Sequence, residues 1–254
     1  MPGVRERLIM EYARERSADR ETHDVVRIGP FLARFDRTTK IRFLNYAMPD
    51  DGAEPTAAEV EELVTTFRGR GLTPALEMLP STAPQARERL MALGFRETAR
   101  LPMLTAAGGD IADIAPPEGV DLRVPMADTE LADFVATQRA VFEDDEVDAR
   151  QVERLRAALA AGANAVSAVD ASGNTVGAAQ TSVPGPIAEI VGVAVLPSHR
   201  RRGIAGAMVA FVARAALDRG LPFVSIEAEP GADGAYRRAG FRDTTEVIHL
   251  ALEA

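Results

Sequence analysis

Residues 199–207 read HRRRGIAGA, so three consecutive arginines stand directly before small residues in an otherwise acidic chain. If a helix begins there, its first four amides have no partner inside the helix, and the helix dipole adds roughly half a positive charge at that end. The small residues leave room for an anion, and the arginines add charge around it. The stretch predicts a phosphate-binding cradle, with a solvated basic run as the alternative. The residues of this cradle are Arg200, Arg201, Arg202, Gly203, Ile204, Ala205 and Gly206.

A second position that could do chemistry is Glu189, the only charged residue of the apolar segment AEIVGVAV, residues 188–195. An apolar environment favours proton uptake by a carboxylate, which makes Glu189 a candidate general base, acting directly or through water. The alternative is a glutamate at a strand end that pairs with a surface arginine. Because an unpaired buried carboxylate is costly, both interpretations stay open.

The second half of the chain contains the elements that must position these residues. An apolar strand is predicted at 187–196, ended by Pro197, and a long helix at 204–219, ended by Gly220. Further strands are predicted at 120–124, 163–169, 175–183, 223–228 and 245–250, and further helices at 129–140, 148–161 and 232–239. This alternation predicts a mixed α/β (α+β) layered domain.

The pattern Arg200-x-x-Gly203-x-Ala205 resembles the R/Q-x-x-G-x-G/A signature of the GNAT superfamily, the acetyl-CoA-dependent N-acetyltransferases. The segment YRRAGF, residues 236–241, is similar to the Tyr-x-x-x-Gly-Phe of that family. Neither GxxxxGK[ST] nor GxGxxG occurs, which disfavours a P-loop or a dinucleotide fold. The resemblance covers residues 120–252. It implies a mixed, mostly antiparallel sheet flanked by helices, with acetyl-CoA as the acyl donor.

The resemblance also implies roles for single residues. Tyr236 would be the acid that protonates the thiolate leaving group, the alternative being a core tyrosine with a wet hydroxyl. The strand would separate from its neighbour, so that the Val193 amide polarises the thioester oxygen. Glu189 matches the base position of the histone acetyltransferase branch, whereas Glu229 stands where the family often has Asn and cannot donate as an amide does. The implied cofactor-binding residues are Val193, Ala194 and Val195 together with the cradle.

The ends of the two halves resemble each other. Residues 74–97 and 222–243 both read as a short strand containing Glu, a proline turn, a short helix and Gly-Phe-Arg followed by an acidic residue. This ordered agreement favours an internal duplication over a chance match.

The first half nevertheless lacks the signature. Carboxylates crowd residues 50–62, where a pyrophosphate would lie, and Leu90 stands at the tyrosine position. We therefore expect a tandem protein with a degenerate GNAT-like domain at 1–108, a linker at 109–119 and a catalytic GNAT domain at 120–254.

The segment FEDDEVD, residues 142–148, lies between the first two helices of the second half, where the family often binds the acceptor. Asp144, Asp145 and Glu146 are candidate substrate-binding residues that would attract a cationic amine. The alternative is a solvated helix cap at Asp148.

Composition limits the remaining possibilities. The chain has 254 residues, a net charge of −9, no cysteine and three scattered histidines, which argues against thiolate chemistry, a metal site and nucleic-acid binding. No apolar run is long enough to span a membrane, and the charged N-terminus does not resemble a signal peptide. We expect a cytoplasmic monomer or homodimer.

The sequence thus predicts an N-acetyltransferase that transfers acetyl from acetyl-CoA to a primary amine, with a small-molecule acceptor favoured. Three alternatives stay open. They are a protein N-acetyltransferase, a non-catalytic acyl-CoA-binding sensor, and a partner-binding protein that uses the acidic segment.

Overall fold

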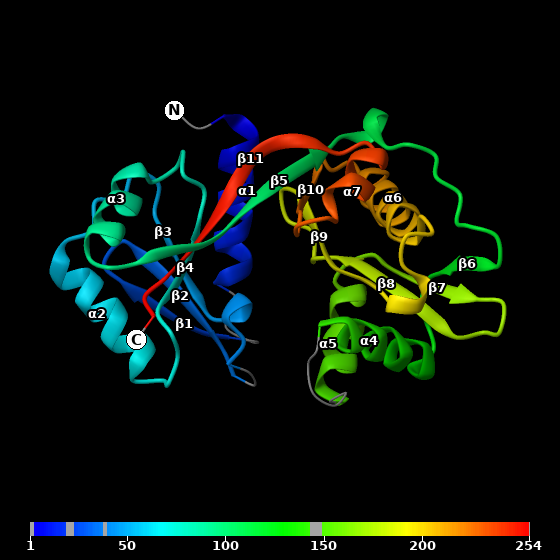
Figure 1. The fold of residues 1–254 in the computed structure, drawn as a ribbon, viewed down its shortest axis with the longest axis horizontal. Coiled ribbons are helices and arrows are strands. Elements are labelled where there is room, and N and C mark those ends of the chain that lie inside the picture. Colours follow the sequence, from blue (N-terminus) through cyan, green and yellow to red (C-terminus); the bar gives the residue numbers. More distant parts are fainter. Residues whose placement is uncertain (1–2, 19–22, 38–39, 143–148, 254) are drawn as a thin grey trace. The chain divides into compact units, whose positions relative to one another are not determined.

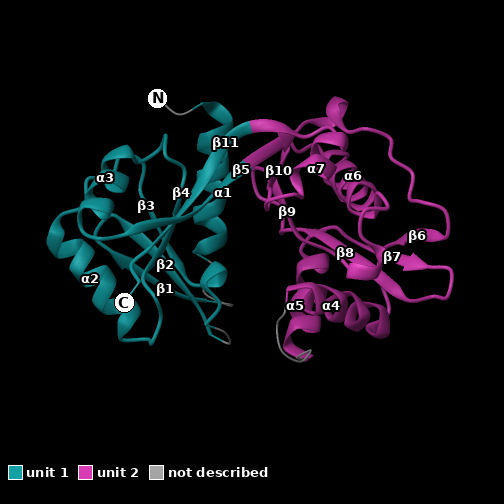
Figure 2. Cartoon of the chain, in the orientation of Figure 1, with its two compact units in different colours: residues 1–102, 244–254 teal, residues 103–243 magenta. Residues whose placement is uncertain are grey.

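The computed structural model describes residues 3–18, 23–37, 40–142 and 149–253. The chain divides into two compact units, unit 1 with residues 1–102 and 244–254 and unit 2 with residues 103–243 (Figure 2). It passes from one unit to the other within two strands, β5 (Arg96–Ala106) and β11 (Arg242–Ala251). The sequence predicted the last strand within a domain at 120–254, whereas the structure assigns most of β11 to unit 1.

Unit 2 is a mixed sheet between two layers of helices (Figure 1). Its strands are β6 (Val120–Arg123), β7 (Ala165–Asp170), β8 (Thr175–Thr181), β9 (Ala188–Val195) and β10 (Val224–Glu227), with the end of β5. Its helices are α4 (Asp128–Phe142), α5 (Ala149–Ala160), α6 (Ile204–Leu217) and α7 (Asp233–Arg238). These elements confirm the predicted ones, with ends that differ by a few residues.

Neighbouring strands in unit 2 follow the order β6-β7-β8-β9-β10-β5, and only β9 and β10 run parallel among the described pairs. One face of the sheet packs on α6 and α7 through a core that includes Val166, Ile190, Met208 and Phe241. The other face packs on α4 and α5 through Leu131, Phe134 and Leu155. The predicted mixed, mostly antiparallel sheet flanked by helices is therefore confirmed.

Unit 1 repeats this mixed pattern on a smaller scale. Its strands β1 (His23–Ile28), β2 (Phe31–Asp36), β3 (Tyr46–Pro49) and β4 (Ala75–Met78) pair in that order, and β11 then pairs antiparallel with β4. Its helices are α1 (Val4–Ser17), α2 (Ala57–Arg68) and α3 (Pro84–Ala92). Phe31, Phe67, Phe95 and Ile248 lie in its core, so the end of β11 completes this core.

The Gly-Phe pair that follows α3 and α7 forms the same turn in both units. Gly94 and Gly240 have φ of 100° and 106°, and each directly follows the C-cap residue of its helix. Phe95 N–H donates to the Leu90 carbonyl and Phe241 N–H to the Tyr236 carbonyl, each at 3.1 Å. This is the Schellman ending of a helix, which favours glycine because other residues are strained at positive φ.

Replacing Gly240 with alanine is expected to lower the melting temperature of the protein far more than Gly94→Ala does. Both changes strain a positive-φ position, at a cost of about 1–2 kcal/mol. A Cβ at Gly240 would also collide with the Asp110 carbonyl, whereas at Gly94 the nearest atom is the Leu252 methyl at 3.3 Å. We expect about 3 kcal/mol or more of destabilisation for Gly240→Ala. Scanning calorimetry of the two variants measures the difference, and equal melting temperatures would contradict it.

The segment predicted as a linker, residues 109–119, packs on unit 2. Ile111 and Ile114 contact the core beneath α6 and α7. Ala112 N–H donates to the Ala239 carbonyl at 3.1 Å, and Arg214 donates to the Ala112 carbonyl at 3.1 Å. The glycines and prolines of this segment give an irregular backbone that is nevertheless held against α6 and α7.

Candidate active site

Strand β9 separates from β10 at the point where the predicted site begins. The two parallel strands are paired at Val224–Ala188 and Ser225–Glu189, and no later pair is formed among the described residues, although β9 continues to Val195. This is the separation that the resemblance implied. It opens one edge of β9.

The backbone of β9 turns toward this open edge at Val193 and Val195. Leu196 N–H donates to the Val176 carbonyl of β8 at 2.9 Å. Because the backbone N–H and C=O groups of successive residues alternate between the two edges of a strand, those of Val195 and Val193 point away from β8. The Val195 carbonyl accepts a hydrogen bond from Arg200 Nε at 3.0 Å, in agreement with that direction. The chain therefore presents peptide groups of Val193 and Val195 on the edge that β10 leaves.

After β9, a short 3₁₀ turn (Pro197–His199) leads to the start of α6. Arg201 has φ 63°, a left-handed conformation that is strained for a residue with a side chain, and Gly203, the N-cap residue of α6, has φ 91°. No side chain caps α6, so the free amides of its first turn remain available. This geometry fits the predicted anion cradle.

A cleft of about 580 Å³ runs along these features in unit 2. It is bounded by the end of β9, the first turn of α6, the end of α4 and the loop and helix that follow β10. Among the predicted residues, those that line it are Val193, Val195, Arg200, Arg201, Gly203, Ile204, Ala205, Gly206 and Tyr236. One cleft thus collects residues from the β9 edge, the cradle and α7.

Three predicted residues do not line the cleft. Ala194 is fully buried in β9 and pairs with Ala178 of β8. Arg202 extends to the Glu118 carbonyl, 3.3 Å from its guanidinium. Glu189 is partly buried, and its N–H donates to the Ser182 hydroxyl at 3.0 Å. The neighbours of Glu189 in β9, Ala188 and Ile190, point into the core beneath α6 and α7. Because successive side chains of a strand point to opposite faces of the sheet, the side chain of Glu189 points to the α4–α5 face.

Tyr236 lies on α7 with only 6% of its surface exposed. Burial, with a smaller contribution from the Glu229 carboxylate, raises the pKa of Tyr236 to about 12. The hydroxyl therefore stays protonated throughout the physiological range and can act as a hydrogen-bond donor.

Several lining residues were not predicted as part of the site. Val141 and Phe142 end α4, and Phe142 is exposed although it is a large apolar residue. Sequence periodicity alone could not distinguish them from core residues of that helix. His199 and the loop from Glu229 also line the cleft. The departure at Glu229 was a visible signal, because a carboxylate stands at a position that the family uses for cofactor contact.

The predicted acceptor residues Asp144, Asp145 and Glu146 lie outside the described residues. Phe142 at the cleft is the last described residue before them.

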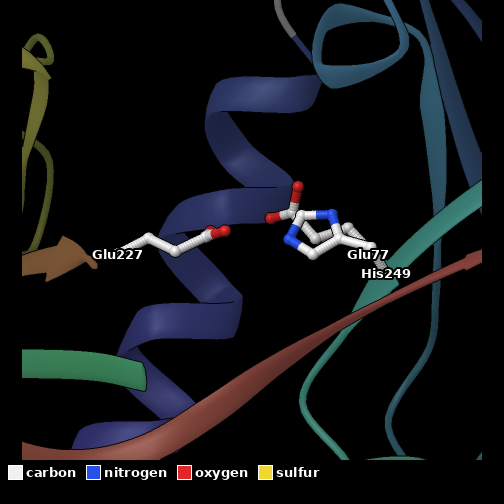
Figure 3. A group of neighbouring side chains, drawn as sticks. All are labelled: Glu77, Glu227 and His249. Atoms are coloured by element: carbon white, nitrogen blue, oxygen red, sulfur yellow. The ribbon is translucent and has the colours of Figure 1, made fainter. Parts of the chain in front are cut away.

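Outside this cleft, Figure 3 shows Glu77 on β4 and His249 on β11, which are cross-strand neighbours in unit 1. The ring of His249 also packs edge-on against Phe43, with centroids 6.2 Å apart. Glu227, the third residue labelled in Figure 3, ends β10 in unit 2. None of these three residues lines the cleft of unit 2.

The comparisons with known proteins agree with this geometry. Residues 129–241, all within unit 2, match the acetyltransferase (GNAT) family. Unit 2 therefore contains a domain of the GNAT acetyltransferase family, which uses acetyl-CoA as co-substrate. No curated protein matches the chain. Among the described residues, no helix has the length and apolar character needed to cross a membrane.

Solved structures share the fold over most of the chain. A GCN5-related N-acetyltransferase from Kribbella flavida is 23% identical, with a TM-score of 0.77, and the match covers 99% of this chain and 96% of that one. One from Sphaerobacter thermophilus is 18% identical, with a TM-score of 0.66 and coverage of 89% and 78%. A tandem GNAT protein from the clavulanic acid biosynthesis pathway is 12% identical, with a TM-score of 0.58 and coverage of 88% and 79%.

Proposed function

We propose that unit 2 transfers an acetyl group from acetyl-CoA to a primary amine of a small molecule. The observation that carries this proposal is the cleft in which the open edge of β9 leads directly to the uncapped first turn of α6. An added strand and an anion are the two things that such a surface binds well. Acetyl-CoA offers both, because its pantetheine arm carries amides and its other end carries a diphosphate.

The residues of the cleft fit this co-substrate. The Val193 carbonyl and the Val195 N–H are placed to bond the pantetheine amides, and the amides of Gly203 to Gly206 to hold the diphosphate. Arg201 adds charge beside them. The lining is otherwise apolar around Val193, Ile204 and Ala235, which suits the alkyl parts of the arm.

In the proposed reaction the uncharged amine nitrogen forms a bond to the acetyl carbon, and the carbon–sulfur bond breaks. Before the attack, the ammonium form of the acceptor gives one proton to Glu189 through water, because Glu189 does not line the cleft itself, and the nitrogen loses a second proton to solvent as the amide forms. The Val193 N–H polarises the thioester oxygen, where negative charge develops. The sulfur leaves with the electron pair of the broken bond as a thiolate.

The raised pKa of Tyr236 refines its role. An ordinary thiol has a pKa of about 8.5, so a phenol with a pKa of about 12 is the weaker acid and would not give up its proton to the thiolate. We infer that Tyr236 keeps its proton and stabilises the departing sulfur by a hydrogen bond. The thiolate then takes its proton from solvent.

The helix N-terminus in unit 1 that corresponds to the start of α6 is occupied by the protein's own side chains. The N-terminus of α2 is closed by a capping box, in which Glu59 accepts from the Thr56 N–H at 2.7 Å. Nearby, Asp50 pairs with Arg27 at 2.7 Å and Glu54 with Arg89 at 3.1 Å. A carboxylate thus occupies the helix end that holds the anion in the proposal for unit 2. We propose that unit 1 is a degenerate GNAT-like domain without a cofactor.

The test begins with the unmodified protein. Isothermal titration with acetyl-CoA measures binding, and a panel of primary amines, with thiol release as the readout, measures transfer. Binding together with release that depends on one amine class would support the proposal. Binding without release for any small or peptidyl amine would favour an acyl-CoA sensor, release with peptidyl amines alone would favour a protein acceptor, and no binding would refute the proposal.

For Glu189→Gln we expect turnover at least about tenfold lower at neutral pH, with acetyl-CoA affinity retained. A general base acts only when ionised, so wild-type turnover rises with pH until the base has lost its proton. The glutamine variant should lose this rise, because its amide does not titrate. A pH–rate profile of both proteins tests this, and an unchanged profile would remove Glu189 from the reaction.

A further inference from the structure

Gln138 of α4 makes a specific contact with the strand that forms the cleft. Its side-chain Nε2 donates a hydrogen bond of 2.8 Å to the carbonyl oxygen of Gly192, in the middle of β9. The bond is partly buried and joins residues that are far apart in the sequence. Gln138 itself does not line the cleft.

Gly192 occupies a β-bulge. The pairing of β8 with β9 shifts between Ala178–Ala194 and Gln180–Val191, so Gly192 and Val193 together stand opposite Ala179. Gly192 has φ 62°, as the glycine of a G1-type bulge does. A Cβ at Gly192 would also collide with the Gln138 amide. The bulge therefore requires glycine at position 192 for two reasons, its positive φ and the close approach of the Gln138 side chain.

The carbonyl that Gln138 holds belongs to the same peptide group as the Val193 N–H. In a planar trans peptide the C=O and the N–H point in opposite directions, so fixing one fixes the other. Gln138 approaches from the α4 side, which directs the Val193 N–H away from α4. A hydrogen bond to the carbonyl also polarises the peptide and makes its N–H a stronger donor.

We propose that Gln138 is a positioning residue that holds the Gly192–Val193 peptide so that its N–H points at the acyl oxygen of the bound thioester. This inference rests on the proposed function, in which the Val193 N–H polarises that oxygen. Gln138 acts through the peptide and does not touch the co-substrate.

The test compares Gln138→Met with Thr137→Val. Methionine has a similar length but cannot donate a hydrogen bond. Thr137 is a matched control on the same helix, because its hydroxyl lies 2.8 Å from the Asp133 carbonyl of α4 and 3.3 Å from the Thr175 carbonyl of β8, and both acceptors are away from the bulge. The readout is the infrared C=O stretch of acetyl-CoA labelled with ¹³C at the acetyl carbonyl, measured bound and free. This readout needs no acceptor amine.

We expect wild type and Thr137→Val to lower the stretching frequency of the bound thioester, and Gln138→Met to lose more than about half of that shift. Acetyl-CoA affinity should change by less than about threefold, since the β9 edge and the cradle remain. With an accepting amine, kcat of Gln138→Met should fall about tenfold while KM for acetyl-CoA is retained. Gln138→Glu, which keeps the volume but has no donor when ionised, should behave like the methionine variant.

The outcomes separate this role from the proposed function. A full wild-type shift in both Gln138 variants would overturn the positioning role and leave the proposed function intact. A wild-type protein that binds acetyl-CoA without any shift of the thioester stretch would overturn both the assigned role of the Val193 N–H and that of Gln138. A loss of the shift in Thr137→Val as large as in Gln138→Met would identify a general packing effect and would also overturn the proposal.

Discussion

Replacing Arg201 with glutamate is expected to raise the dissociation constant of acetyl-CoA about 30- to 100-fold. Arg201 lines the cleft at the start of α6, and its charge is exposed. A single exposed ion pair contributes at most about 1 kcal/mol, but charge reversal replaces attraction by repulsion of a diphosphate, for a total of about 2–3 kcal/mol. Because salt screens exposed charges, the difference from wild type should shrink at high ionic strength.

The neighbouring Arg202 provides the matched control. Its guanidinium donates to the Glu118 carbonyl instead of lining the cleft, so Arg202→Glu should change acetyl-CoA affinity by less than about threefold. Titration calorimetry at two salt concentrations compares the two reversals. Equal losses would show that the two arginines act only through the overall positive charge of the segment.

How much of this site could be predicted depends on how local each signal is. The start of α6 was predictable because Pro197 ends the strand and Gly203 permits the left-handed N-cap that begins the helix. The Gly-Phe turn after α7 was visible for the same reason. The start of α6 and the Gly-Phe turn each depend on the backbone preferences of a few consecutive residues, which can be read from the sequence.

The three arginines, in contrast, are indistinguishable in sequence. The positive φ of Arg201 turns the backbone so that consecutive side chains leave in different directions. Arg200 consequently bonds the Val195 carbonyl and Arg202 the Glu118 carbonyl. The sequence predicted a basic cradle, but the folded turn determines that Arg200 and Arg201 line the cleft and Arg202 does not.

Contacts between residues far apart in the chain could not be predicted from the sequence pattern. The residues of β11 predict a strand, but its partner β4 lies far away in the chain, so the sequence placed this strand with the second half. Gly192 inside a strand is a known sign of a bulge, yet nothing near it indicates that Gln138 is the side chain that meets it. Residue identity predicts an element well and predicts its tertiary partner poorly.

Replacing Tyr236 with phenylalanine is expected to lower kcat about 100- to 1000-fold while acetyl-CoA affinity stays within about threefold of wild type. The ring is buried against the core of unit 2 and phenylalanine preserves that packing, so the change removes only the hydroxyl. A hydrogen bond to the departing sulfur is stronger once the sulfur carries charge, so its loss falls on kcat rather than on binding.

The pKa of Tyr236 fixes the pH dependence that accompanies this loss. Because burial raises that pKa to about 12, the hydroxyl stays protonated and able to donate at every pH below about 11. Wild type and Tyr236→Phe should therefore differ by the same factor from about pH 6 to pH 10, measured as kcat by thiol release with binding followed by calorimetry. A factor that shrinks toward alkaline pH would mean that Tyr236 loses its proton within that range. A kcat equal to that of wild type would leave the hydroxyl with a structural role only.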